Sequence, residues 1–214
     1  MKRLITLTLV FAALCCISCK EDGDGKGKDD QVVTPPAHVA QKYVIGNYYN
    51  KNGVQGIVYK LNSGDTSGMI VSIDEGNCIW TDSTHYVKTD AVEAEDGSKN
   101  MEKIKALGIN DYPAFSWCNA KNSNGVTGWY LPASNQLWDV AKIYSQINDT
   151  LSTVNGSVLI VNNGTYWSST DADASLSGYS QAYYVKVPNT SGENPGMNQG
   201  VKTLQYKVRA VRAF

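Results

Sequence analysis

Histidine and cysteine, which supply most zinc ligands, are scarce in this 214-residue sequence. The two histidines are His38 and His85, and only Cys78 and Cys118 lie beyond residue 19. A zinc site of the usual ligand set is therefore not expected, and we predict neither metal nor cofactor. Two cysteines do not make a disulfide framework. A Cys78–Cys118 disulfide and two buried thiols are both compatible with the sequence.

An excess of charge of either sign is also missing. The chain has 19 basic and 20 acidic side chains, which gives a net charge of −1. Neither a basic footprint for nucleic acid nor a polybasic patch for a membrane surface is present, so we predict no nucleic-acid partner.

The apolar run at the start of the chain, residues 4–14, is too short to anchor stably across a bilayer. It follows a short basic start and ends at Cys16-Ile17-Ser18-Cys19. A small residue directly before a cysteine is typical of a lipoprotein signal, so we predict cleavage after residue 18 and lipid on Cys19. An ordinary secretory signal with incidental cysteines is the alternative.

The residues after Cys19 suggest where the protein is sent and how it is held. Lys20-Glu21-Asp22 resembles the export signal of some surface-exposed lipoproteins of the Gram-negative outer membrane. Residues 19–40 are rich in Gly, Asp and Lys and lack apolar residues to bury, so we read them as a flexible tether. The predicted organisation is a signal at 1–18, a tether at 19–40 and one folded domain at 41–214.

The centre of that domain is predicted at a strand end that turns directly into a helix, around Pro132. Pro132 cannot continue a strand ladder, and its fixed φ suits helix entry. Ser134 is the expected helix cap, and Gln136 is expected to reach back in a partial capping box. Apolar residues at helical spacing then predict a helix to about residue 148. Trp129 and Trp138 flank this corner, which we interpret as a packing centre.

The remaining pattern is strands, then helices, then strands, which favours an α+β fold with an antiparallel sheet. Alternation predicts strands at 54–61, 69–73, 157–161, 166–170, 182–187 and 202–212. Helices are predicted from residue 96 to a stop at Gly108, and from Pro113 to Cys118. Residues 188–200 are expected to form a long polar loop.

Four motifs in a fixed order resemble a known family. They are Pro113-Ala114-Phe115-Ser116-Trp117-Cys118, Gly128-Trp129-Tyr130-Leu131-Pro132, Tyr166-Trp167-Ser168-Ser169-Thr170 and Val208-Arg209-Ala210-Val211-Arg212. Together they resemble a domain of unknown function that forms the C-terminal domain of bacterial collagen-like adhesins and is common in surface lipoproteins. The resemblance implies a C-type-lectin-like fold: a mostly antiparallel sheet, two or three flanking helices and long polar loops.

We expect the motifs shared with that family to have a structural role. Trp129, Tyr166 and Trp167 are expected to bury large areas. Arg209 and Arg212 are expected to face opposite sides of a strand, and one of them to meet a carboxylate or the carbonyls near Pro132. An unpaired buried arginine would be costly. Recognition is therefore expected in the loops.

The chemistry associated with this fold group is only partly matched. Calcium-dependent sugar binding needs a Glu-Pro-Asn or Gln-Pro-Asp triplet and Trp-Asn-Asp. Here Glu193-Asn194-Pro195 has the wrong order, and Trp-Asn-Asp is absent. The group also includes formylglycine-generating oxidases, but Cys118 on an apolar helical face suggests an inert thiol. A Ser/His/Asp site built on His85 lacks a nucleophile turn. We predict that the protein is not an enzyme.

Binding through loops is the remaining expectation. Tyrosine is abundant, at 13 residues, and tyrosine rings suit both sugars and protein partners. The predicted ligand-binding residues are Asn124, Asp171, Asp173, Tyr179, Glu193, Asn194 and Asn198. The main hypothesis is a surface-exposed lipoprotein, held to the membrane by lipid on Cys19, that binds a glycan or protein. The alternative is a structural or accessory subunit of a surface assembly such as a fimbria.

Overall fold

A hairpin with an Asn-Gly turn begins the first sheet. β1 (Tyr48–Lys51) pairs antiparallel with β2 (Val54–Leu61), and Asn52 and Gly53 form the two-residue turn with φ of 52° and 76°. Positive φ at both turn positions suits the twist of the paired strands. β3 (Gly68–Val71) pairs with β2, and β9 (Val211–Ala213) pairs with β3, giving the order β1-β2-β3-β9. This computed structural model describes residues 40–172 and 178–214.

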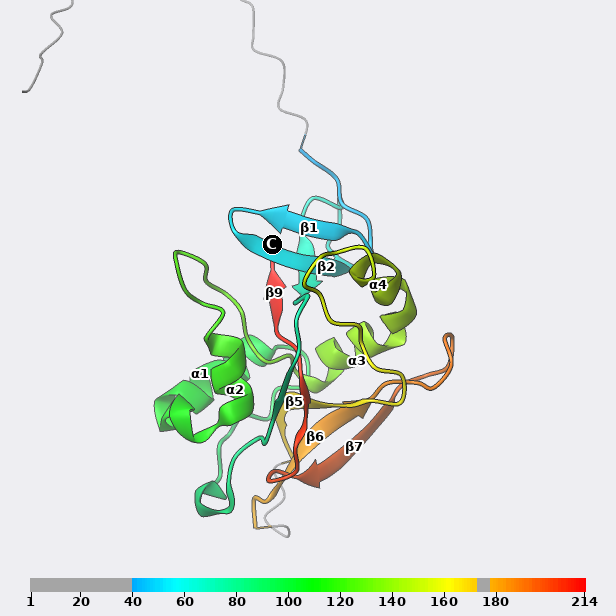
Figure 1. The fold of residues 1–214 in the computed structure, drawn as a ribbon. Coiled ribbons are helices and arrows are strands. Elements are labelled where there is room, and N and C mark those ends of the chain that lie inside the picture. Colours follow the sequence, from blue (N-terminus) through cyan, green and yellow to red (C-terminus); the bar gives the residue numbers. More distant parts are fainter. Residues whose placement is uncertain (1–39, 173–177) are drawn as a thin grey trace, which may run out of the picture. The chain divides into compact units, whose positions relative to one another are not determined.

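The second sheet is built mainly from the later strands. Its order is β4 (Gly76–Cys78), β8 (Tyr206–Val208), β5 (Thr165–Asp171), β6 (Gln181–Lys186) and β7 (Gly196–Val201). All pairs are antiparallel except β5 with β8. Figure 1 shows this sheet at the end of the domain opposite β1 and β2.

Four α-helices lie in the described part of the chain. α1 (Gly97–Leu107) and α2 (Pro113–Asn119) lie on one side in Figure 1, and α3 (Ser134–Lys142) and α4 (Tyr144–Leu151) on the other. Two short 3-10 turns, η1 (Ser83–His85) and η2 (Ile109–Asp111), complete the elements. The predicted α+β class is confirmed. The C-type-lectin-like assignment stays a prediction.

Several elements form where the sequence predicts them. Asp96 caps α1 by accepting from the Ser98 N–H, and α1 is followed by Gly108 in the left-handed region. α2 begins at Pro113, and β2 and β3 pair as expected. Trp80 and Trp167 are fully buried in the core, where edge-to-face packing joins Trp80 to Phe115 at a centroid distance of 4.9 Å.

The helix after Pro132 differs from the prediction in its start and its length. Ser134 is not the cap but the first helical residue, and its N–H donates to Thr170 Oγ1 instead. Gln136 does reach back, because its Oε1 accepts from the Ala133 N–H at 3.0 Å. The predicted single helix breaks at Ile143. The break lets α3 pack on β5 and β6 while α4 packs on β2.

The strand predictions for the second half of the chain are wrong in three places. Residues 157–161 form no strand, because the N–H and the carbonyl of Ile160 both form hydrogen bonds with the side-chain amide of Asn148. The last five residues of the expected loop at 188–200 belong to β7, which forms through pairing with β6 although its sequence is poor in strand formers. The expected strand at 202–212 is two strands in different sheets. β1 and β4 were not predicted.

The chain crosses between the sheets at Arg209, which lies between β8 and β9. Its guanidinium donates to the Ser72 carbonyl at 2.9 Å and to the Val158 carbonyl, and it lies 3.3 Å from Glu75 Oε2. Glu75 also accepts from Tyr166 Oη at 2.5 Å. The prediction that one arginine meets a carboxylate and carbonyls is thus met by Arg209, although not near Pro132.

The entry to the domain and Phe214 lie at the same end of the first sheet. The Tyr43 ring packs edge-on against Phe214 at 4.7 Å between centroids, and Tyr49 contacts both rings. The Phe214 N–H donates to the Gly68 carbonyl at 3.0 Å. The Tyr43 N–H donates to the Asp65 carbonyl, so the first segment is held to the loop between β2 and β3 and the second to the first residue of β3.

A buried ion pair joins the end of β5 to the residue after β7. Lys202 Nζ lies 2.8 Å from Asp171 Oδ2, and both side chains are almost fully inaccessible. Thr89 Oγ1 donates to the same oxygen at 2.6 Å, and the ammonium lies 4.4 Å from the centre of the Trp80 ring. Burial lowers the pKa of Lys202, and the charge of Asp171 opposes that shift. Asp171 is therefore a core residue.

We expect Lys202→Met to destabilise the protein by about 3–5 kcal/mol, because it leaves the Asp171 carboxylate buried without its counterion. The double variant Lys202→Met with Asp171→Leu should be markedly more stable than the single variant, since no buried charge remains. Urea unfolding followed by tryptophan fluorescence measures both. A single variant as stable as the wild type would contradict this assignment.

Candidate functional site

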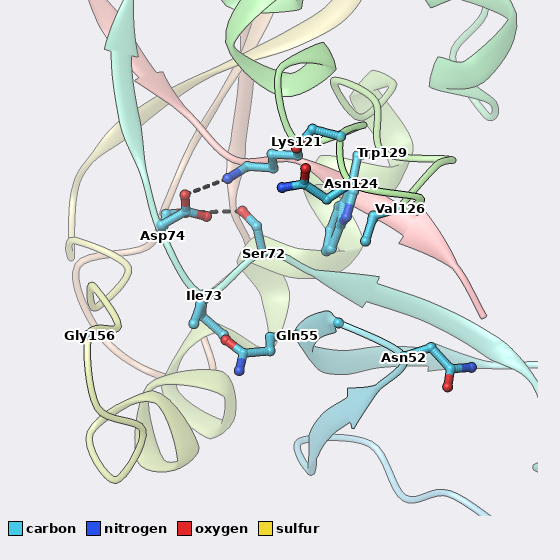
Figure 2. A pocket seen from close by; sticks show the side chains of 12 residues that line it. Asn52, Gln55, Ser72, Ile73, Asp74, Lys121, Asn124, Val126, Trp129 and Gly156 are labelled. Carbon is cyan, nitrogen blue, oxygen red and sulfur yellow. Dashed lines mark hydrogen bonds and ion pairs between the residues drawn. The ribbon is translucent and has the colours of Figure 1, made fainter. Parts of the chain in front are cut away.

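An open hollow of about 620 Å³ lies between the β1–β2 turn, the end of β3 and the loop after α2 (Figure 2). Three separate segments of the chain and one turn contribute to it. The lining residues are Asn52, Gly53, Gln55, Ser72, Ile73, Asp74, Lys121, Ser123, Asn124, Val126, Trp129 and Gly156. Most of them are polar, which favours a ligand with hydrogen-bonding groups.

Two Asn-Gly turns form the rim of this hollow. Asn52-Gly53 closes the β1–β2 hairpin, and Asn124-Gly125 has φ of 53° and 82° in the loop after α2. Asn and Gly adopt positive φ at low cost, so both turns are locally specified. A Cβ placed on Gly53 would lie 3.7 Å from Val126 Cγ2. The two turns therefore approach each other closely.

One wall of the hollow carries an ion pair. Lys121 Nζ donates to Asp74 Oδ2, and Figure 2 shows the two side chains reaching toward each other. The same ammonium lies 4.1 Å from the centre of the Trp117 ring. Ser72 Oγ donates to the Asp74 carbonyl at 3.0 Å, which fixes the backbone below the pair. The wall thus offers one fixed cation and a half-exposed carboxylate to a polar ligand.

Trp129 borders the hollow but remains largely buried, with 5% of its surface exposed. The side chain of Asn122 holds it from both sides, accepting from its N–H at 2.8 Å and donating to its carbonyl at 2.9 Å. Trp167 is fully buried, and its indole donates to the Leu204 carbonyl at 3.1 Å. Both tryptophans are therefore parts of the frame.

The structure does not bring the predicted ligand-binding residues together. Asn124 is exposed and lines the hollow. Glu193 and Asn194 are exposed in the connection between β6 and β7, which Figure 1 shows well away from the loop after α2. Tyr179 lies in a turn before β6 with φ of 60°. The binding role of these residues stays a prediction.

Two of those predicted residues have different roles from the ones expected. Asp171 is buried and paired with Lys202, so it cannot serve as a loop ligand. Asn198 lies on β7 opposite Tyr184 and not in a loop. Asp173 and Cys19 lie outside the described residues.

The sequence analysis missed most of the hollow. Gln55, Asp74 and Lys121 were not predicted as site residues, although all three line it. The Asn-Gly dipeptide at residue 52, between two alternating apolar stretches, is a strong hairpin signal that could have located one rim. The ion pair between Asp74 and Lys121 joins residues that are 47 positions apart, so no short sequence motif predicts it.

The described residues offer no obvious catalytic set. Thr84 Oγ1 lies 2.9 Å from His85 Nδ1, and Asp111 Oδ2 lies 3.3 Å from Nε2 on the other side of the ring. The Thr84 hydroxyl, however, donates to Asp82 Oδ1 at 2.5 Å, so its proton is not directed to the imidazole, as it is in a Ser/His/Asp site. Among residues 40–172 and 178–214, no group of three or more His, Cys, Asp or Glu side chains is placed to hold a metal ion. The absence of enzymatic activity stays a prediction.

His85 instead bridges two carboxylates on the surface. Its Nδ1 lies 2.9 Å from Asp82 Oδ1, and its Nε2 lies 3.3 Å from Asp111 Oδ2. The hydrogen bond to Asp82 raises the pKa of His85, and bonds from Thr84 and His85 lower the pKa of Asp82 to about 2. The protonated imidazole is therefore the form that this site stabilises.

We expect Asp82→Asn to lower the pKa of His85, because the largest cause of its upward shift is removed. The stabilisation from His85 should be present below its unfolded pKa, near 6.5, and should be lost as pH rises through its higher folded pKa. Titration of the imidazole by NMR in both proteins tests this. An unchanged His85 pKa in the variant would contradict the role of Asp82.

Cys78 and Cys118 are free thiols in the structure, which corresponds to the second of the two alternatives left open by the sequence. Cys118 is buried in α2, and Cys78 is half-buried in β4. Burial raises the pKa of both thiols, and for Cys118 it outweighs the opposing charge of Lys121. A reactive cysteine needs a lowered pKa, so neither has the properties of a nucleophile.

We expect both thiols to react slowly with iodoacetamide at pH 7.5 in the native protein, and Cys118 more slowly than Cys78 because it is fully buried. Unfolding in urea should raise both rates to that of an ordinary thiol. Mass spectrometry of timed samples resolves the two sites. Fast native alkylation of Cys118 would contradict its assignment as a core residue.

No helix in residues 40–172 and 178–214 is both long and apolar enough to cross a membrane.

Comparisons with known proteins give a likeness of fold. A scan against protein-family models finds no match, and a search of curated proteins finds none. Among solved structures, the fold is similar to the crystal structure of a fimbrial protein from Bacteroides ovatus ATCC 8483, with a TM-score of 0.61 and 17% sequence identity. The likeness covers 80% of this chain and 49% of that one, so this chain spans about half of the other protein's length.

Proposed function

We propose that this chain is a structural or accessory subunit of a cell-surface assembly of the fimbrial kind. The observation that carries the proposal is the likeness of fold to a fimbrial protein over 80% of the chain. The rigid core, built on fully buried Trp80, Trp167 and Arg209, suits a subunit that must keep its shape within an assembly.

The proposed location is the outer membrane surface, with lipid on Cys19 as the anchor. This rests on the pattern of residues 1–22 in the sequence, where a short apolar run ends at Ser18-Cys19 and is followed by Lys20-Glu21-Asp22. The tether at 19–40 would hold the folded domain away from the lipid. The assignment to the collagen-like adhesin domain family, with its C-type-lectin-like fold, belongs to the same proposal.

A binding role is the second candidate, and the open hollow of Figure 2 is the observation that favours it. Amide side chains of Asn52, Gln55 and Asn124 offer both donors and acceptors. The Asp74–Lys121 pair adds fixed charge. These groups suit the hydroxyls of a glycan or the backbone of a protein ligand, and the two rigid Asn-Gly turns reduce the entropy lost on binding.

Purification of the protein from its own cells under mild detergent tests the first proposal. We expect it to co-purify with a multi-subunit fibre, and we expect Cys19→Ala to release the protein from the membrane fraction. Ser18→Ala, which keeps a small residue before the cysteine, is the matched control and should stay membrane-bound. Recovery of the wild type only as a free monomer would contradict the fibre proposal.

A glycan array with a thermal-shift screen tests the second candidate. Saturable stabilisation by a soluble ligand, lost in Asn124→Ala with Gln55→Ala, is the expected result for a receptor. Binding unchanged in that double variant would remove the hollow as the site.

A further inference from the structure

A second groove is lined by residues 127–130 and shares Trp129 with the hollow of Figure 2. It consists of two adjoining hollows of about 630 and 270 Å³, which share Ser98, Thr127, Gly128 and Tyr130 in their linings. One wall is the first half of α1, and the other is residues 127–130 with β9. We call it the α1 groove. Its polar groups and its size are those of a ligand site.

Arg212 lines the larger part of the α1 groove. It is the central residue of β9, opposite Ile70. Its side chain lies along Gly128, where an added Cβ would be 3.4 Å from the Arg212 Nε. The φ of 88° and the lack of a side chain at Gly128 therefore give the arginine its position.

The guanidinium of Arg212 has no partner in the described part of the chain: no carboxylate lies within 4.0 Å, and no oxygen accepts a hydrogen bond from it. Arg209, three residues earlier, has two carbonyls and a carboxylate. The expectation that both arginines belong to the scaffold is therefore met only by Arg209. A half-buried guanidinium without a counterion is a natural receptor for a carboxylate, which it binds through two parallel N–H donors.

The two acids beside Arg212 are already engaged. Asp96 Oδ1 accepts from the Ser98 N–H at 3.0 Å and from Ser98 Oγ at 2.6 Å. It also lies at the positive end of α1, which stabilises its charge. Glu95 accepts from the Asn135 side chain. Of the charged groups lining the larger hollow, the guanidinium is thus the one that lacks an intramolecular partner within the described residues.

We propose that the α1 groove binds an acidic saccharide whose carboxylate lies on Arg212. The hydroxyls of Ser98 and Thr127 line both hollows and match sugar hydroxyls as both donors and acceptors. The smaller hollow adds one acid and one base, Glu102 and Lys105, whose charges balance. The unused oxygens of Glu95 and Asp96 accept from sugar hydroxyls but repel a second anion nearby. A ligand with isolated carboxylates among hydroxyls therefore fits better than an acidic peptide.

The probe is a trimer of galacturonic acid, titrated into the full chain in detergent by calorimetry. Its fully methyl-esterified form has the same chain without charge and is the matched control ligand. We expect saturable binding of the acid, at least tenfold weaker binding of the ester, and weakening with added salt because part of the attraction is screened.

Arg212→Gln should weaken binding of the acid at least tenfold and leave the ester unaffected. Lys103→Gln removes the same charge from an exposed position on α1 outside the groove lining, and should bind like the wild type. Arg212→Lys keeps the charge but loses the paired donors, so its affinity should be intermediate. If Arg212→Gln does not fold, the proposal is still tested by the affinity of Arg212→Lys and by comparing the acid with the ester on the wild-type protein.

Three results would overturn the proposal: no saturable binding of the acidic trimer, equal affinity for acid and ester, or wild-type affinity in a folded Arg212→Gln protein. Binding of an acetylated Asp-Glu-Asp peptide without binding of the trimer would overturn the saccharide assignment. The proposal does not depend on fibre assembly, which is tested separately by co-purification.

Discussion

The hydrogen bonds of Arg209 hold together the point where the chain passes from one sheet to the other. One guanidinium reaches the Ser72 carbonyl after β3, the Val158 carbonyl in the segment after α4, and the Glu75 carboxylate before β4. Ser72 and Glu75 lie in one short segment, and a hydrogen bond from the Val158 N–H to the Ile73 carbonyl joins the third acceptor to it. A buried guanidinium requires several partners, and these three groups supply them.

The two candidate binding surfaces both lie close to the crossing at Arg209. Ser72 and Asp74, which lie beside the Arg209 contacts, form the floor and one wall of the open hollow. Arg212, three residues beyond Arg209, lies on β9 and faces the α1 groove. Residues 127–130 line the second surface, share Trp129 with the first, and are fixed by Asn122 and by the Tyr130–Val211 bridge. A rigid frame therefore presents two different polar surfaces without requiring a mobile element.

The sequence predicted those elements whose signals are local. The cap at Asp96, the stop at Gly108 and the proline at the start of α2 each depend on a few neighbouring residues, and each was found. Elements decided by distant partners were missed. Gly196–Val201 has Val201 as its single strong strand former and becomes β7 because it pairs with β6. Residues 157–161 have a strand-like sequence, but both backbone groups of Ile160 bond to the side chain of Asn148 instead of to a neighbouring strand.

The candidate sites were less predictable than the fold for the same reason. Asn124 was predicted because neighbouring polar residues mark its segment as a loop. The residues that face it across the hollow come from β2 and from the end of β3, which are far from it in the sequence. Asp171 looked like a loop acid because Lys202, its partner, is 31 residues away. The guanidinium of Arg212 lacks a counterion because of the residues that surround it in the fold. No sequence pattern predicts that a counterion will be missing.

The contact between Tyr43 and Phe214 has a practical consequence for labelling this protein. Both rings lie at the end of the first sheet where the chain enters the domain, with Tyr49 between them. A reporter joined after Phe214 would emerge beside the entry point and crowd that end. The exposed turn at Gly192, between β6 and β7, has a positive φ and open space around it, and it is a better position for an inserted tag when that end must stay clear.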